Sequence, residues 1–157
     1  MANNIYLRIR GKTQGNISAG CSSYDSIGNK YQSMHRDEIL VVSVSFDISR
    51  IQNLSHAPIS ITKHVDKSTP LLLTAITNNE VLSCEIDYYR TSNAGIQEKY
   101  MTIILTNASI VNYSQIHANT LTQSDALPSE VITLRYESIT CNHLIAGTSG
   151  YSISNTI

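Results

Sequence analysis

Apolar and polar residues alternate one by one in run after run of this chain, and this pattern constrains the fold more than any other feature. The clearest runs cover residues 5–10, 39–48, 59–62, 82–89, 100–105, 109–116 and 131–139. Because successive strand residues point to opposite faces of a sheet, each run predicts a half-buried strand. The turn cluster Thr91–Gly95 between two of the runs predicts a hairpin.

Each run divides into an apolar face and a polar face. In the run over residues 39–48, one face holds the apolar Leu40, Val42, Val44, Phe46 and Ile48. The other face holds the polar Ser43, Ser45 and Asp47, with Ile39 and Val41 at its start. The polar faces of the runs over residues 82–89 and 131–139 include Glu85, Asp87, Thr133 and Arg135. The apolar faces are the candidate core, and the polar faces remain available for contacts outside it.

One segment departs from the strand pattern and predicts a helix. Ser68 or Thr69 can cap the first turn, and Pro70 suits the first helical position because the missing N–H of proline costs nothing there. The segment continues to Asn78–Asn79, which is expected to end it. A helix this short is unstable alone, so we expect Leu72, Leu73 and Ile76 to pack on the sheet.

The chain is therefore predicted to be mainly β. We expect one β-barrel or two-sheet domain over residues 1–157, with about seven or eight antiparallel strands and one short α-helix at about residues 70–78. Two polar loops stand out, at about residues 24–38 and 118–129. A short polar tail is expected at about residues 142–157.

Charge and hydropathy exclude several classes of protein. A net charge of −1 without a dense Lys/Arg run argues against binding to nucleic acid. No apolar run approaches the ~18 residues of a membrane helix, so no membrane insertion is expected. The start, Met1–Ile5, has no basic region followed by an apolar core, and we therefore expect no signal peptide.

The sequence shows no pattern typical of a catalytic or metal site. Cys21, Cys84 and Cys141 stand far apart and form no zinc-ligand spacing, which favours reduced thiols. No H-E-x-x-H or G-x-S-x-G pattern occurs. His56 and His64 could meet across a strand pair as metal ligands, but surface or core histidines are the simpler interpretation. We expect no enzyme activity, no cofactor and no metal.

Several stretches, in this order and spacing, resemble the Hcp family (haemolysin-coregulated protein), the tube protein of bacterial type VI secretion. They are Ile5–Leu7, Gly20–Gly28, His35–Ile39, Thr62–Leu72, Tyr89–Thr91, Gln97–Tyr100 and Leu134–Thr140. The most specific piece is the motif before the helix, made by Lys63, Asp66, Ser68, Thr69 and Pro70. The resemblance runs from about residue 4 to 151. Similar proteins usually carry an aromatic residue, often Trp, where this chain has Cys141.

The resemblance implies a non-catalytic structural protein that assembles with itself. Members form six-membered rings that stack into a hollow tube inside a contractile sheath, with a spike protein at the tip and, in some cases, effector cargo in the lumen. The protein would be made in the bacterial cytoplasm and then secreted through the type VI system without a signal peptide.

The resemblance also indicates which residues could carry assembly. By match, the early loop would stack one ring on the next through Tyr31, Gln32, His35, Arg36, Asp37 and Glu38. Candidates for the lumen or for contacts within a ring are Ser43, Ser45, Glu85, Asp87, Thr133 and Arg135.

Two other classes of function remain open at this point. One is a barrel that binds a small molecule or a glycan without catalysis, which would need an apolar pocket lined by Leu, Ile and Tyr. The other is an effector hydrolase, but the residues that follow the matched region are too few for a catalytic domain.

Overall fold

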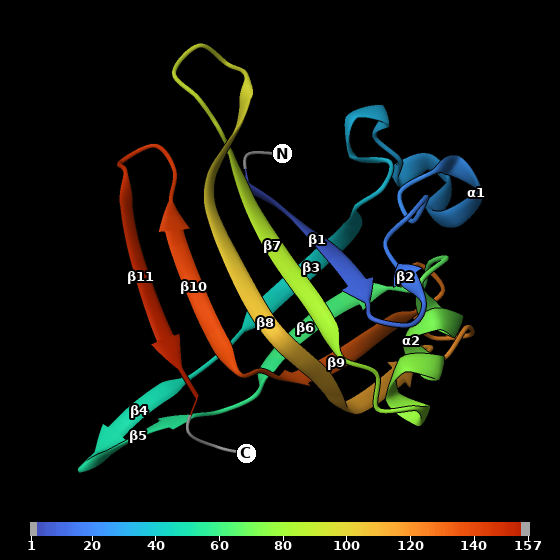
Figure 1. Ribbon diagram of the computed structural model, residues 1–157. Coiled ribbons are helices and arrows are strands. Elements are labelled where there is room, and N and C mark those ends of the chain that lie inside the picture. The colour runs from blue at the N-terminus through green and yellow to red at the C-terminus, as the bar shows by residue number, and fades with distance from the viewer. Residues whose placement is uncertain (1–2, 155–157) are drawn as a thin grey trace.

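The structure is a computed structural model that describes residues 3–154. Its strands are β1 (Asn3–Gly11), β2 (Gly15–Asn16), β3 (Ile39–Ser45), β4 (Ile48–Ile51), β5 (Asn53–His56), β6 (Ile59–His64), β7 (Leu82–Thr91), β8 (Gln97–Ile116), β9 (Ser129–Arg135), β10 (Ser138–His143) and β11 (Thr148–Ile153). Its helical segments are α1 (Tyr24–Ile27), α2 (Thr69–Thr77) and the 3₁₀ turns η1 (Gly28–Lys30) and η2 (Ser33–His35). The strands form most of the body, and the helical segments lie at one side of it (Figure 1).

Within the described residues, six of these strands close a barrel (Figure 1). They follow one another in the order β8-β7-β1-β3-β6-β9, and β9 pairs again with β8. Every one of these pairings is antiparallel. β10 pairs with the first half of β8 and carries β11 as a hairpin outside the closed barrel. The prediction of a mainly β, antiparallel fold is confirmed.

The long strand β8 makes closure possible. Its 20 residues replace the two separate strands predicted at residues 100–105 and 109–116. Asn107 adopts a left-handed backbone conformation with φ 49°, which few residues other than glycine accept readily. The chain bends there, so the first half of β8 pairs with β7 and the second half pairs with β9.

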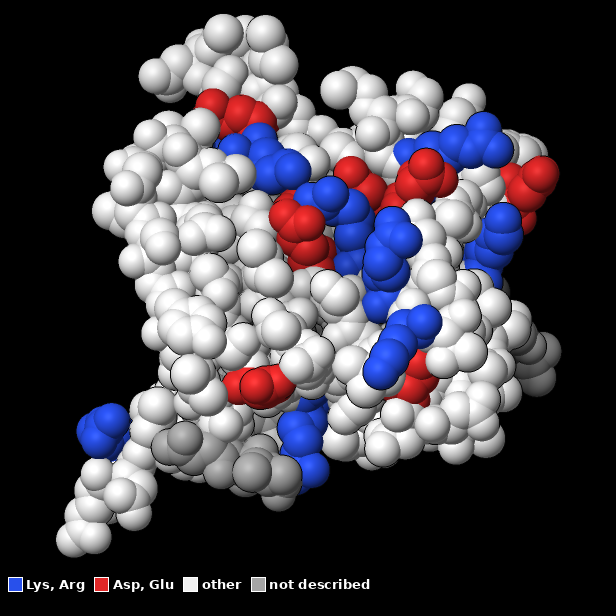
Figure 2. All heavy atoms as spheres, viewed as in Figure 1, with Lys and Arg blue, Asp and Glu red and all other residues white. Residues whose placement is uncertain are grey.

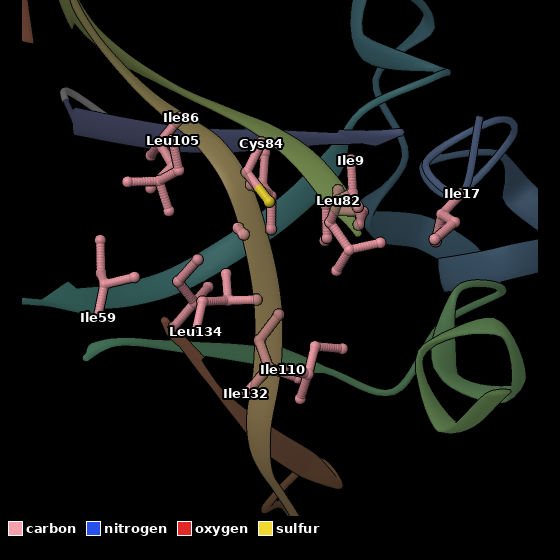
Figure 3. Close-up of a cluster of buried hydrophobic side chains, with 14 of the residues drawn as sticks. Ile9, Ile17, Ile59, Leu82, Cys84, Ile86, Leu105, Ile110, Ile132 and Leu134 are labelled. Carbon is pink, nitrogen blue, oxygen red and sulfur yellow. The ribbon is translucent and has the colours of Figure 1, made fainter. Parts of the chain in front are cut away.

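Aliphatic side chains fill the interior of the barrel. Figure 3 shows Ile9, Ile86, Leu105, Ile132 and Leu134, which come from β1, β7, β8 and β9 and are all buried. The alternation of these strands places their apolar faces inward, as predicted for residues 5–10, 82–89 and 131–139. The barrel is therefore a packed core.

The hydrogen bonds at the start of α2 differ from those predicted. The helix itself covers nearly the predicted residues, and Ser68 is its N-cap, but the Ser68 side chain bonds to no amide of the helix. Its hydroxyl donates instead to Asp66 Oδ1. The Thr69 hydroxyl accepts the Asp66 N–H at 3.2 Å.

The inner face of α2 was only partly predicted. Leu72 and Ala75 are buried and Ile76 is half-buried, whereas Leu73 is 56% exposed. The expectation that Leu73 packs on the sheet is therefore wrong. Residues 72, 75 and 76 follow the three- and four-residue spacing of one helix face, and residue 73 lies about 100° away from residue 72.

The face of β3 that enters the core also differs from the prediction. Ile39 and Val41 are buried, whereas Val42 and Phe46 are exposed. The pairing of β3 with β6 shifts register between Val41 and Ser43, which marks a β-bulge. A bulge adds one residue to one strand and so reverses which side chains face inward.

The two chain segments predicted as polar loop and polar tail both contain regular structure. Residues 24–38 form α1, η1 and η2 in succession. The segment after residue 142 completes β10 and contains β11, whose residues pair with all of β10. This strand could not be predicted from the sequence, because small residues such as Thr148, Ser149 and Gly150 show no alternation of apolar and polar types.

Candidate functional site

The loop over residues 24–38 is anchored to the barrel by His35, its buried side chain. The His35 ring stacks on Tyr6 with centroids 3.9 Å apart and meets Tyr89 edge-on at 4.9 Å. Its Nδ1 lies 3.0 Å from Glu38 Oε2, and its Nε2 lies 3.1 Å from Gln97 Oε1. His35 was expected to present itself for stacking, but its burial makes it a support for the loop.

Backbone bonds hold the other side of the same loop. Gly20 N–H donates to Asp37 Oδ1 at 2.9 Å, and Ser22 N–H donates to the Arg36 carbonyl at 3.0 Å. The Ser22 hydroxyl donates to the carbonyl of Glu38. The loop is therefore fixed along both edges, and its outward side chains are held at defined positions.

Four of the predicted stacking residues are exposed on this loop, and two of them, Tyr31 and Arg36, border a hollow. Tyr31, Gln32, Arg36 and Asp37 face outward, and Glu38 is half-buried beside His35. Tyr31 meets Tyr24 edge-on, with centroids 6.0 Å apart. The hollow beside this pair has a volume of about 390 Å³ and is lined by Ser22, Ser23, Tyr24, Asp25, Tyr31, Ser33 and Arg36.

A charged cluster lies on the outer face of β1 and β7. Arg8 binds Glu85 at 2.7 Å and Asp87 at 2.9 Å, and Lys99 lies 3.6 Å from Asp87. The Thr102 hydroxyl donates to Asp87 at 3.2 Å. Burial opposes the charge of Arg8, but the two carboxylates outweigh it and raise the pKa of its guanidinium. Asp87 is completely buried under these partners, so it cannot contact another subunit as the polar pattern suggested.

The remaining lumen or ring candidates lie on a different part of the barrel. Ser45 is opposite Ser60, and Ser60 is opposite Thr133, so three hydroxyl side chains form a row across β3, β6 and β9. Ser43 and Arg135 are exposed nearby on the same strands. The structure therefore does not bring these residues together with Glu85 and Asp87.

The motif before α2 forms a buried polar cluster. Lys63 is completely buried, and its ammonium donates to Asp66 at 2.9 Å and to Glu130. The Thr69 hydroxyl donates to Glu130 Oε1 at 3.0 Å, and the Tyr113 hydroxyl donates to the other oxygen. Burial, followed by the bond to Glu130, raises the pKa of Tyr113. The motif thus joins β6, β8 and β9 to the start of α2, and Pro70 follows it in the first turn.

An arm formed by β4 and β5 was missed by the sequence reasoning. These strands make a separate two-stranded sheet that projects from the barrel (Figure 1). Ile48 and Ile51 are exposed on it, and Phe46 is exposed just before it. The sequence predicts one strand over residues 39–48, although Pro58 and the polar pair Gln52–Asn53 are a signal for a turn and a return strand.

The base of the arm is bonded to the C-terminal hairpin. The two ring nitrogens of His56 lie 2.8 Å from the Tyr136 hydroxyl and 2.9 Å from the Ser152 hydroxyl. Ala57 N–H donates to the carbonyl of Asp47 at 3.0 Å. His64 is at the far end of β6, opposite Ser129, so the two histidines do not meet.

Charge is unevenly distributed over the visible face. Figure 2 shows Lys, Arg, Asp and Glu side chains in a band across the face, while the part over β10 and β11 carries none. Residues 138–154 contain no charged residue. Leu144, Ile145, Tyr151 and Ile153 are exposed there.

The thiols show no sign of reactivity. Burial raises the pKa of both Cys21 and Cys84 to about 12, so these thiols stay protonated at neutral pH. Cys141 is half-buried and lies across from Ile103 and Gly150. Across residues 3–154 no group of three or more His, Cys, Asp or Glu side chains could hold a metal ion. Over the same residues no helix is long and apolar enough to cross a membrane.

The sequence matches a known family over most of its length. The family model described as "Type VI secretion system effector, Hcp" matches residues 6–143. The chain belongs to the Hcp family. A similar protein is the "Major exported protein" of Pseudomonas aeruginosa, which is 38% identical over 162 residues that cover 96% of this chain and 94% of that protein.

A second relative is considerably longer than this chain. The "Uncharacterized protein YhhZ" of Escherichia coli K12 is 42% identical over 150 residues. This match covers 94% of the present chain but only 37% of YhhZ. The chain therefore spans little more than a third of that relative.

Solved Hcp structures have the same fold. A structure titled "Crystal structure of Hcp protein" superposes with a TM-score of 0.93 at 33% identity, covering 99% of this chain and 100% of that one. The "Secreted protein Hcp3 from Pseudomonas aeruginosa" gives 0.90 at 37% identity with the same coverage. The barrel, the loop, the arm and the C-terminal hairpin thus all lie within the Hcp likeness, and the chain is a type VI secretion Hcp protein.

Proposed function

We propose that this Hcp protein is the tube subunit of a type VI secretion system. Copies assemble into hexameric rings, and the rings stack into a hollow tube. The observation that carries the proposal is the likeness to the two Hcp structures, which covers 99% of the chain at more than 30% identity. The names of two relatives, "Major exported protein" and "Secreted protein Hcp3", support the proposal that the subunit is secreted.

The surface of the subunit supports self-association. β11 is at an edge of the sheet and, among residues 3–154, pairs with a strand on one side only, so its outer backbone groups can pair with another chain. Exposed Tyr151 and Ile153 on β11, without charged neighbours on the hairpin, make the surface typical of a subunit contact. We place the contact within a ring at this uncharged hairpin.

Stacking of rings uses a different surface in this proposal. Tyr31, Gln32, Arg36 and Asp37 project from the loop over residues 24–38, with Glu38 and His35 fixing its shape. Ser43, Ser45, Thr133, Arg135 and Glu85 remain candidates for the lumen or for ring contacts.

The other partners follow from the tube. A contractile sheath surrounds it, a spike protein sits at its tip, and effector cargo can travel in its lumen. The subunit assembles in the bacterial cytoplasm and then leaves through the type VI system. The subunit does no chemistry in this role.

Light scattering and electron microscopy test the proposal. The purified chain should elute with a mass near six times the 17.3 kDa of one chain, and micrographs should show rings. A mass of one chain at all concentrations, with no rings on the grid, would contradict it.

The alternative of a barrel that binds a small molecule or a glycan finds no support in the geometry. Such a barrel needs an internal apolar pocket. Branched side chains such as Ile86, Leu105 and Leu134 occupy the interior instead (Figure 3). The larger hollow of about 660 Å³ lies outside the barrel, among polar side chains such as Arg8, Arg10 and Glu85.

A further inference from the structure

We propose that the hollow of about 660 Å³ on the outer face of β1 binds a soluble sugar phosphate. The phosphate group lies between the guanidinium groups of Arg10 and Arg36, and the polar groups around them bond to the hydroxyls of the sugar. The hollow is outside the barrel, so this site does not need the internal apolar pocket of a ligand-binding barrel. The inference adds a ligand site to the subunit and does not rest on the proposed tube.

Four segments that are distant in the sequence line this hollow. They are β1, the stretch that begins with β2, the loop over residues 24–38, and β7. A volume of about 660 Å³ is within the range of small-molecule sites, which is roughly 300–1,000 Å³. The hollow is therefore large enough for a phosphorylated sugar.

Arg10 has no acidic partner, and the pairing of the strands explains why. Residues 8 and 10 point to the same face of β1, because side chains alternate along a strand. Arg8 is opposite Glu85 and binds it at 2.7 Å, whereas Arg10 is opposite Ser83 on β7 and Asn16 on β2. Both of these partners are short and uncharged. Among residues 3–154, the exposed Arg10 side chain makes no ion pair.

Arg36 brings a second free guanidinium to the same hollow. Its carbonyl accepts the Ser22 N–H at 3.0 Å, and the adjacent Asp37 accepts the Gly20 N–H at 2.9 Å, so the backbone is fixed here. The Arg36 side chain is exposed and makes no ion pair with any residue that the structure describes. Two guanidiniums on fixed backbone positions suit a phosphate group, because each presents a planar pair of N–H donors that matches two phosphate oxygens.

The rest of the lining suits a sugar. The hydroxyls of Ser33 and Ser83 make no hydrogen bond within the described chain, and the half-buried carboxylates of Glu38 and Glu85 can accept bonds from sugar hydroxyls. Met34 is 87% exposed and offers apolar surface to the face of a sugar ring. The same carboxylates repel a ligand with many negative charges. One phosphate on a carrier rich in hydroxyls therefore fits better than a polyanion.

Methyl NMR of labelled methionine tests the site whether the chain is in rings or alone. Met34 lines the hollow, whereas Met101 is half-buried in β8 and does not line it. Glucose 6-phosphate should shift the Met34 methyl signal and leave the Met101 signal in place. Glucose alone and inorganic phosphate alone should each bind at least about tenfold more weakly, because each makes only part of the contacts. An unchanged Met34 signal at about 10 mM glucose 6-phosphate would overturn the proposal.

Variants of the two arginines test where the phosphate binds. Arg10→Gln and Arg36→Gln should each raise the Kd for glucose 6-phosphate at least about tenfold, because each loses charge-assisted bonds to the phosphate. Both side chains are exposed, so the circular dichroism spectrum should not change. Arg135→Gln, at an exposed arginine of β9 that does not line the hollow, is the control and should keep the original Kd. Arginine variants that bind as tightly as the control would refute the assignment.

Two further measurements separate this inference from related ones. The head group of a phosphorylated lipid has similar chemistry, so vesicles with phosphatidylinositol 4-phosphate are titrated in parallel, and a Met34 response to vesicles alone would overturn the soluble ligand. Light scattering of the same samples reports on rings. Rings without a Met34 response would overturn this inference and leave the tube subunit standing. A chain that binds glucose 6-phosphate but stays monomeric would support the site and refute the proposed function.

Discussion

At the scale of single residues, the cluster around Lys63 is stable only while each of its buried charged groups has a partner. The ammonium of Lys63 is fully buried with the carboxylates of Asp66 and Glu130. A buried ion pair adds little net stability over apolar packing, because desolvation offsets the attraction between the charges. Removing one member is costly, however, because its partners remain buried and charged. The family motif thus has a structural role at the start of α2.

We predict that Lys63→Met lowers the free energy of unfolding by about 3–5 kcal/mol, as for other buried ion pairs that lose one partner. Urea denaturation followed by circular dichroism measures it. Lys30→Met, at an exposed lysine, should change the value by less than about 0.5 kcal/mol. Equal values for the two variants would contradict the buried cluster.

Alkaline titration provides a second test at this scale. Burial raises the pKa of Tyr6, Tyr88 and Tyr89 to about 12, against about 10 in the unfolded chain. A raised pKa means that the folded state favours the neutral phenol. Its contribution to stability is therefore complete below pH 10 and is lost as the pH rises to 12.

We therefore expect Tyr6, Tyr88 and Tyr89 to ionise only near pH 12, together with unfolding, and to give a late stage in the absorbance change of tyrosine ionisation. The chain in concentrated urea should show one transition near pH 10. A single transition near pH 10 in the folded protein would contradict the burial of these phenols.

At the scale of elements, neighbouring residues of one helix have opposite environments. Leu72 is buried against the barrel and Leu73 is 56% exposed. Burial of a leucine side chain in a packed core determines the cost of truncating it, because truncation leaves a cavity. The adjacent pair therefore serves as variant and control on the same helix.

We predict that Leu72→Ala destabilises the protein by about 2–5 kcal/mol, whereas Leu73→Ala stays within about 0.5 kcal/mol. Thermal or urea unfolding of both variants checks this difference. Similar losses from the two variants would place α2 in another orientation on the barrel.

His35 determines the order of a second element, the loop over residues 24–38. Its ring stacks on Tyr6 and bonds to Gln97, so one side chain joins the loop, β1 and β8. We predict that His35→Ala increases amide hydrogen exchange throughout the loop at least about tenfold, while β9 retains its protection. His117→Ala, at an exposed histidine, should leave both unchanged. Exchange in the loop equal to that of the unmodified protein would contradict this anchor.

At the scale of the whole molecule, the subunit has two kinds of surface, the uncharged hairpin of residues 138–154 and the charged band (Figure 2). Some charged side chains are paired within the subunit, as Arg8 is with Glu85 and Asp87 and Arg90 is with Glu98. The hairpin has no such partners and exposes apolar side chains at a sheet edge. The ring contact proposed at the hairpin would cover these exposed apolar side chains, and removing apolar surface from water is favourable.

We predict that Tyr151→Asp separates rings into single chains, because a carboxylate would lose its hydration in the contact. Light scattering should show the mass of one chain, with an unchanged circular dichroism spectrum. Leu121→Asp, at another exposed apolar residue, should leave the rings intact. If the Tyr151→Asp variant still forms rings of unaltered mass, the contact within a ring does not involve β11.

Particular elements show what could be predicted in advance. Strict alternation revealed β1 and β7, and the proline with its flanking polar residues revealed α2. The bulge in β3 was not predictable, since residues 42–48 alternate without interruption while the backbone shifts register between Val41 and Ser43. β11 gave no signal because its small residues fit many backbone conformations.

Some parts of the candidate site could likewise be predicted from the sequence, and others could not. The motif with Lys63 and the loop with Tyr31 and Arg36 could be located from residue types and order. The burial of His35 and Asp87 could not, because it depends on partners such as Gln97 and Lys99 that lie elsewhere along the chain.

The sequence alone determined that this protein is a β structure and that a short helix follows Ser68, because alternation and helix-start signals are local properties of neighbouring residues. Only the tertiary structure decided that the strands close through a bent β8, that an arm projects, and that the uncharged residues 138–154 form a hairpin at the edge of the sheet. These features depend on which distant strands pair and in which register, and the energy of that pairing comes from burial of the whole core at once.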